Sequence, residues 1–124
     1  MKLKSMRVTD SFRAFVVDQL SEVPQVSARA MFGGVGLYAG DVFFGLLARD
    51  VLYFKTDDSN RGDYQAAGMS AFRPYANKAM TMPYFEVPVS VLENAPELAA
   101  WARRAVAAAR AGKAAKSKTR KALP

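Results

Sequence analysis

Apolar side chains near the N-terminus recur at the spacing of one helix face. The set comprises Phe12, Phe15, Val16, Leu20 and Val23. Thr9 precedes the first of them and is a favourable N-cap residue, whereas Pro24 cannot continue a helix because its ring removes a donor and clashes with the preceding turn. The pattern therefore predicts a helix over residues 10–21.

Four short segments then change to the pattern of strands. Residues 25–31 alternate between polar and apolar side chains, and three more apolar runs cover 35–38, 42–48 and 51–55. Gly40 lies in the connection between two of these runs and permits a tight hairpin, because glycine adopts positive φ without strain. Few polar residues interrupt the run at 42–48, so we expect the middle of the sheet to be covered on both faces.

The next part of the chain returns to mixed structure. Residues 59–67 stand between a cluster of N-cap residues and a glycine, and they predict a short helix. Residues 72–75 and 79–87 predict two more strands, joined at 76–78. Each of these runs contains a proline, which removes a ladder donor and therefore favours the edge of a sheet.

The last apolar pattern predicts the longest helix of the chain. Its stripe consists of Leu98, Trp101, Ala102, Ala105, Val106 and Ala109. The element order is α-β-β-β-α-β-β-α, with residues 25–31 as an additional strand. This order predicts an α+β domain in which helices pack on an antiparallel sheet.

Three closely spaced glycines interrupt the apolar pattern between residues 30 and 40. We interpret this segment as a tight backbone path beneath packed side chains, and we take it as a candidate interaction surface consisting of Met31, Phe32, Gly33, Gly34 and Gly36. A phosphate-binding loop is the alternative. It is disfavoured because a strand follows the glycines, whereas a phosphate loop needs a helix N-terminus.

Composition removes most catalytic chemistry. The 124 residues include no cysteine and no histidine, so the usual zinc ligand sets, thiolate nucleophiles and imidazole bases are absent. We expect no enzyme activity, no metal and no cofactor. Glu86, which is close in sequence to Tyr84, is a weak candidate for a carboxyl with a raised pKa, and a solvated strand position is the favoured interpretation.

Aromatic residues on the predicted strands allow two interpretations. They are Tyr53, Phe54, Phe72, Tyr75, Tyr84 and Phe85. They could form a platform for stacking nucleic-acid bases, but few lysines or arginines are interleaved with them. Core packing is therefore the favoured interpretation.

The net charge of +7 belongs mainly to the C-terminal end. Five cations lie in the last twelve residues, at Lys113, Lys116, Lys118, Arg120 and Lys121. Residues 1–112 carry 13 basic and 11 acidic side chains and are nearly neutral. We expect residues 1–112 to form the domain and residues 113–124 to form a disordered basic tail, which either improves solubility or binds nucleic acid.

Several segments together resemble a known family. They are residues 29–38, residues 52–57, the run Met-Pro-Tyr-Phe-Glu-Val-Pro at 82–88, and residues 98–105. In this order they resemble the N-terminal domain of the TfoX/Sxy family, regulators of competence for DNA transformation. The resemblance implies a secretion-chaperone-like α-β(3)-α-β(2)-α arrangement and no catalytic residues.

The resemblance also suggests a function. Full-length competence regulators carry a second, helical domain and are thought to act with the cyclic-AMP receptor protein at selected promoters, whereas this sequence has a short basic segment in that place. We expect a non-enzymatic regulatory or protein-interaction module whose partner is an unidentified protein, such as part of the transcription machinery. The alternative is an accessory protein that binds nucleic acid nonspecifically through the tail.

Assembly and location are also expectations at this point. No apolar h-region follows the first residues, and no run approaches 18 apolar residues. We therefore expect a cytoplasmic protein that does not enter a membrane. The sequence is consistent with a monomer or a homodimer.

Overall fold

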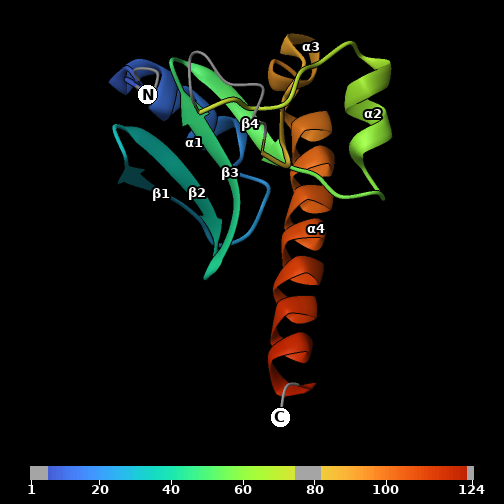
Figure 1. Ribbon diagram of the computed structural model, residues 1–124. Coiled ribbons are helices and arrows are strands. Elements are labelled where there is room, and N and C mark those ends of the chain that lie inside the picture. The colour runs from blue at the N-terminus through green and yellow to red at the C-terminus, as the bar shows by residue number, and fades with distance from the viewer. Residues whose placement is uncertain (1–5, 75–81, 123–124) are drawn as a thin grey trace.

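Helices and strands follow one another in an α+β order (Figure 1). The computed structural model describes residues 6–74 and 82–122, with side chains as far as residue 115. The elements are α1 (Asp10–Gln19), β1 (Val26–Met31), β2 (Gly34–Ala39), β3 (Val42–Ala48), β4 (Val51–Lys55), α2 (Arg61–Ala66), β5 (Tyr84–Glu86), α3 (Val89–Leu92) and α4 (Ala95–Ala122). The predicted fold class is confirmed, and residues 25–31 do supply the additional strand.

The five strands form one antiparallel sheet in the order β1-β2-β3-β4-β5. Two-residue connections join the neighbouring strands of the first half. Gly40 has φ 61°, and Arg49 and Asp50 have φ 53° and 58°, so the turns on both sides of β3 use the left-handed backbone region that tight hairpins require. Thr9 stabilises the last of these turns, because its backbone N–H donates to Asp50 Oδ1 at 2.8 Å.

One predicted strand is reduced to a single bridge. Among the described residues 70–74, pairing with the sheet is limited to an isolated bridge between Ala71 and Phe85 of β5, with the N–H of Phe72 donating to the carbonyl oxygen of Tyr84. Of the predicted strand at 79–87, residues 79–81 lie outside the described residues, and within 82–87 the strand β5 covers three residues. The predicted connection at 76–78 lies outside the described residues.

The sheet separates two apolar clusters. The larger cluster lies between the sheet and the helices α1 and α4, and it includes Val16, Leu20, Leu37, Phe44, Leu47, Leu52, Phe54, Leu98, Ala102 and Ala105. The smaller cluster lies on the opposite face and consists of Leu46, Ala48, Tyr53, Phe72 and Tyr84. The central strand β3 supplies side chains to both clusters, as its apolar sequence predicts.

Both long helices use the apolar stripes found in the sequence, with one correction. Leu98 and Ala102 of α4 are fully buried, and so is Val16 of α1. Phe15, however, is 42% exposed, although it belongs to the predicted stripe of α1. The stripe contains more apolar residues than one face of a ten-residue helix can bury, so Phe15 lies beside the core.

The basic end of the chain continues α4. The sequence predicts disorder after Gly112, whereas the backbone of α4 runs through to Ala122. Alanine and lysine have high helix propensity, and a helix already formed by core packing is extended at low cost. Gly112 therefore does not end the helix, while the division of the chain into a domain and a tail stays a prediction.

Candidate interaction surface

The glycine segment forms the tip of the β1–β2 hairpin. Met31 pairs with Gly34, so Phe32 and Gly33 are the two central residues of the turn. Their φ angles are 50° and 82°, which is the backbone of a type I′ turn. The favoured interpretation of this segment as a turn is confirmed.

The two glycines that follow the turn permit close packing. A Cβ atom on Gly34 would lie 2.7 Å from the carbonyl oxygen of Leu47, and one on Gly36 would lie 2.6 Å from Met31 Sδ. Both distances are shorter than van der Waals contact allows. These glycines therefore bring β2 against β3 and let the Met31 side chain fold over the sheet.

Phe32 is the residue at which the sequence interpretation is wrong. We expected the large side chains around the glycines to be packed, but Phe32 is 82% exposed. A two-residue turn directs the side chain of its first central residue away from both strands, and no other described element covers it. Asparagine is the residue typical of this position, and a bulky residue at positive φ is strained.

A chain of aromatic rings crosses the face of the sheet that carries the smaller cluster. The ring centroids of Tyr38 and Phe43 lie 5.3 Å apart, and those of Phe43 and Tyr84 lie 5.5 Å apart. A cation stands at each end, since the Arg29 guanidinium lies 4.6 Å from the centre of the Tyr38 ring and Lys55 Nζ lies 5.3 Å from that of Tyr84. Burial raises the pKa of Tyr84 to about 12.

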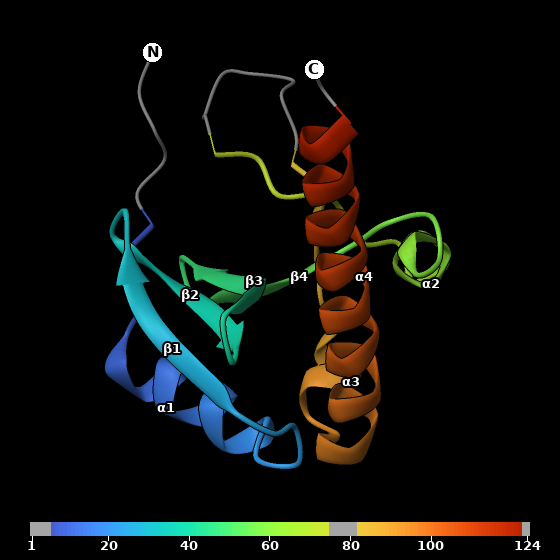
Figure 2. The ribbon, with the colours of Figure 1, turned by 90° about the horizontal axis from the view of Figure 1, so that it is seen from below.

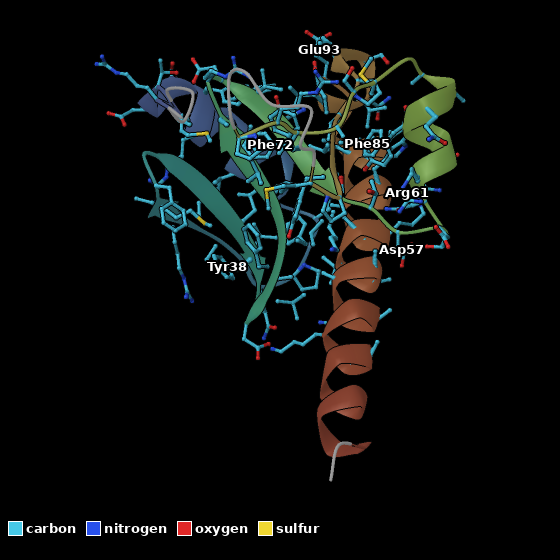
Figure 3. The ribbon with its side chains drawn as sticks, viewed as in Figure 1. Tyr38, Asp57, Arg61, Phe72, Phe85 and Glu93 are labelled. Carbon is cyan, nitrogen blue, oxygen red and sulfur yellow. The ribbon has the colours of Figure 1, made fainter. Side chains whose placement is uncertain are left out.

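The predicted aromatic set belongs mainly to the core. Tyr53, Phe54, Phe72 and Tyr84 are each less than 10% exposed. Phe72 is labelled in Figure 3, and its ring packs edge-on against that of Tyr53, with centroids 5.0 Å apart. Tyr75 lies outside the described residues. Core packing is therefore confirmed for these four residues, which rules them out as an open stacking platform.

Glu86 is half-buried on β5, and its backbone N–H donates to the carbonyl oxygen of Ser70 at 3.0 Å. Within residues 6–74 and 82–122, no group of three or more acidic side chains is placed to hold a metal ion. In the same residues, no helix is long and apolar enough to cross a membrane.

The five cations predicted as a basic tail lie in the C-terminal part of α4, after the buried residue Ala109. Lys113 Nζ lies 3.0 Å from Asp41 Oδ2 at the β2–β3 turn, with both side chains largely exposed. This hydrogen bond and the positive charge of Lys113 lower the pKa of Asp41. The backbone of Lys116, Lys118, Arg120 and Lys121 continues the helix, so the five candidate cations follow one another along a single element.

One surface feature was not predicted from the sequence. A hollow lies between α1 and the outer strand β1, and its lining residues are Asp10, Arg13, Ala14, Val17, Asp18 and Ala28. Val17 is 37% exposed. The sequence feature that could have indicated this hollow is Val17, an apolar residue directly after Val16. It makes the apolar stripe of α1 wider than one buried face requires.

Comparison with protein-family models identifies one family. Residues 18–109 match the model of the TfoX N-terminal domain, a regulatory and non-catalytic type of domain associated with competence for DNA transformation. No match was found among curated proteins. The match spans all five strands and the packed part of α4. The chain therefore belongs to the TfoX N-terminal domain family.

Proposed function

We propose that the chain is a non-enzymatic module that regulates transcription in the context of competence by binding a protein partner through the β1–β2 turn. The family supplies the regulatory context. The exposed aromatic side chain of Phe32 carries the proposal. The rest of the glycine segment holds that side chain in place.

Phe32 is unfavourable for the free protein in two respects. Its φ of 50° is strained for a bulky residue, and its ring is mostly in contact with water. Asparagine would relieve both costs without changing the turn. Aromatic residues are also among the side chains that contribute most to the free energy of protein–protein binding.

The test is therefore the substitution Phe32→Asn. We expect it to raise the free energy of unfolding by about 0.5–1 kcal/mol, because asparagine tolerates positive φ, and to abolish partner binding. Proteins bound by the wild-type chain and by the variant would be compared by quantitative mass spectrometry of nuclease-treated cell extract. Val89→Ser is the matched control, since Val89 is 62% exposed on α3.

The result distinguishes folding from binding. A variant that is more stable and has lost a partner that Val89→Ser retains would support the proposal. A partner set identical in all three proteins would refute it. Reporter activity from competence promoters in a strain carrying Phe32→Asn then tests whether this contact acts on transcription.

Nucleic-acid binding is a second candidate, supported by the continuous helix that carries the basic residues from Lys113 to Lys121. If all five cations contact phosphates, the logarithm of the affinity for duplex DNA should fall with the logarithm of the salt concentration with a slope of about −4.5. Fluorescence anisotropy of labelled duplex would compare the full chain with a chain ending at Gly112. Equal binding by both proteins would refute this candidate.

A further inference from the structure

Strand β1 has no neighbour on its outer side among the described residues. The N–H of Gly40 donates to the carbonyl oxygen of Gln25, so these two residues form a hydrogen-bonded pair. In an antiparallel ladder such pairs recur at every second residue, and the residues between them direct their N–H and C=O groups away from the partner strand. In this register the backbone groups of Val26, Ala28 and Ala30 point outward. The hydrogen bond from Arg13 Nη2 to the carbonyl oxygen of Ala28, at 3.0 Å, confirms this direction independently.

The usual protection of an edge strand is weak along β1. Natural edges carry prolines, bulges or charged side chains that prevent another strand from pairing. The sequence of β1 is Val-Ser-Ala-Arg-Ala-Met, with no proline, and the one register shift nearby lies between Leu37 and Tyr38. Arg29 is the only charge on β1, and it is stacked on Tyr38 at 4.6 Å instead of lying across the edge.

The hollow lies beside this free edge. Helix α1 runs alongside β1 at the end of the sheet opposite to α2 and α4 (Figure 2). Ala14, Val17 and Ala28 form the apolar part of the lining, and Asp10 and Asp18 are exposed at its rim. Arg13 is the basic residue of the lining, and its guanidinium is hydrogen-bonded to Ala28. Arg13 keeps its positive charge in this hydrogen bond, so two acidic side chains and one basic side chain line the hollow and leave a net negative charge.

We propose that β1 accepts an extended, basic segment of a partner protein as a sixth strand. The outward groups of Val26, Ala28 and Ala30 would form the ladder, and one aliphatic side chain of the segment would occupy the hollow against Val17. Lysine or arginine side chains of the segment would lie next to Asp10 and Asp18. This mode of binding uses main-chain hydrogen bonds for affinity and the hollow for specificity.

A segment bound in this way would have the geometry of a strand. Side chains on one face of a strand recur every second residue, at about 6.6–6.8 Å. The segment should therefore alternate between side chains that face α1 and side chains that face the opposite surface. The inference rests on the proposed function as a protein-binding module, but it uses a surface other than Phe32.

The test begins with a displayed library of random nine-residue peptides selected on the full chain. We expect the enriched peptides to carry a valine, isoleucine or leucine and at least one lysine or arginine. One enriched peptide, labelled with a fluorophore, is then titrated against three variants. Ala28→Pro and Val17→Lys should each weaken its affinity at least tenfold, and Val89→Lys should leave it unchanged.

Ala28→Pro is chosen because the lost N–H points outward. The substitution removes a donor from the free edge and none from the β1–β2 ladder, and proline is tolerated on edge strands. If this variant does not fold, Ala30→Pro removes the other central donor, and methylation of alternate backbone nitrogens of the peptide gives the same information on the wild-type chain. Amide exchange should slow at Ala28 and Ala30 when the peptide is bound.

Three results would overturn the inference. They are a library without enrichment, an affinity that none of the edge variants or methylated peptides weakens, and a dimer of this chain in analytical ultracentrifugation that Ala28→Pro dissociates. The last would assign the edge to a second copy. If Phe32→Asn loses its partner while the edge variants bind normally, the proposed function stands and the strand pairing is wrong.

Discussion

The two edges of the sheet are built in different ways. β1 is six residues long, and within the part of the chain that the structure describes the hydrogen bond to its outer backbone groups comes from Arg13. β5 is three residues long, and residues 70–72 cover it: Glu86 N–H donates to the carbonyl of Ser70 and Phe72 N–H to that of Tyr84. Helix α2 adds a further layer, since the Tyr64 ring lies 5.9 Å from that of Phe85. One edge is closed by the chain itself, whereas the other is left open.

Composition explains the difference. The closed edge is lined by large aromatic rings. The apolar area that they bury offsets the conformational entropy lost when the irregular segment over that edge becomes ordered. The open edge has alanines and a serine, which bury little and leave room for another backbone. A domain of this size could have closed both edges, so the open one is where we expect binding, and the closed one is where we expect stability.

The largest expected effect comes from breaking the closed edge. Phe72 is 5% exposed and packs on Tyr53 at 5.0 Å. Phe72→Ala should lower the free energy of unfolding by about 3–5 kcal/mol, because it leaves a cavity between residues 70–72 and the sheet. Met31→Ala, which removes a half-buried side chain at the open edge, should cost about 1 kcal/mol. Chemical denaturation with urea measures both.

These two substitutions test whether the two edges differ in their contribution to stability as well as in shape. Equal losses for Phe72→Ala and Met31→Ala would mean that the open edge is as important for folding as the closed one. β1 would then be needed for folding and would not be free to bind a partner. A large loss of stability in Phe72→Ala alone would show that the closed edge stabilises the fold and that the open edge does not.

Most of the fold could be predicted from the sequence, and the edges show where the prediction stops. The stripe of α4 and the runs of β2, β3 and β4 depend on local periodicity, so a pattern of apolar residues is sufficient to find them. The bridge at Ala71 depends on a single long-range pair and leaves no period in the sequence. The predicted strand at 79–87 contains β5, but the three-residue length of β5 leaves no period in the sequence either.

The candidate site was predicted only in part. Glycine spacing identified the turn at residues 32–33, because only certain residues accept its backbone. Whether Phe32 is buried depends on what lies over the turn, which the sequence does not encode locally. The open edge of β1 was not predicted either, since a strand is an edge only by its position in the finished sheet.

The next effect concerns the layer over the closed edge. Tyr64 is 1% exposed, its ring packs at 4.8 Å from that of Trp101, and its hydroxyl finds no hydrogen-bond partner among the described residues. A buried hydroxyl without a partner costs free energy, so Tyr64→Phe should be neutral or should stabilise the protein by about 1 kcal/mol. Thermal unfolding at neutral pH measures this. A loss of more than 1 kcal/mol would show that the hydroxyl does have a partner.

The same variant has a pH signature. Burial raises the pKa of Tyr64, so the folded state keeps a proton that the unfolded state releases near pH 10. The contribution of Tyr64 to the free energy of unfolding is fully present below that pH, and it is lost as the pH rises toward the pKa of the folded state. The fall in stability above about pH 10 should therefore be shallower in Tyr64→Phe than in the wild type.

The smallest effect tests how the far part of α4 meets the sheet, at the β2–β3 turn between the two edges. The hydrogen bond and charge of Lys113 lower the pKa of Asp41 from its ordinary value of 3.8. Lys113→Ala should return the pKa of Asp41 toward that value, as followed by NMR titration of the carboxyl carbon. Arg110→Ala is the control, because Arg110 contributes least to the shift.

The sign of the accompanying stability change follows from the direction of the shift. A carboxyl with a lowered pKa in the folded state stabilises the protein above its unfolded pKa, and this contribution is lost as the pH falls through the folded pKa. As the pH falls from the unfolded pKa to the folded pKa of Asp41, the free energy of unfolding should therefore fall slightly more in wild type than in Lys113→Ala, and the two proteins should become equally stable at lower pH. The difference at neutral pH should be small because both side chains are exposed. If Asp41 titrates identically in both proteins, α4 does not contact the turn in solution. Lys113 would then need no release from Asp41 before it could contact nucleic acid.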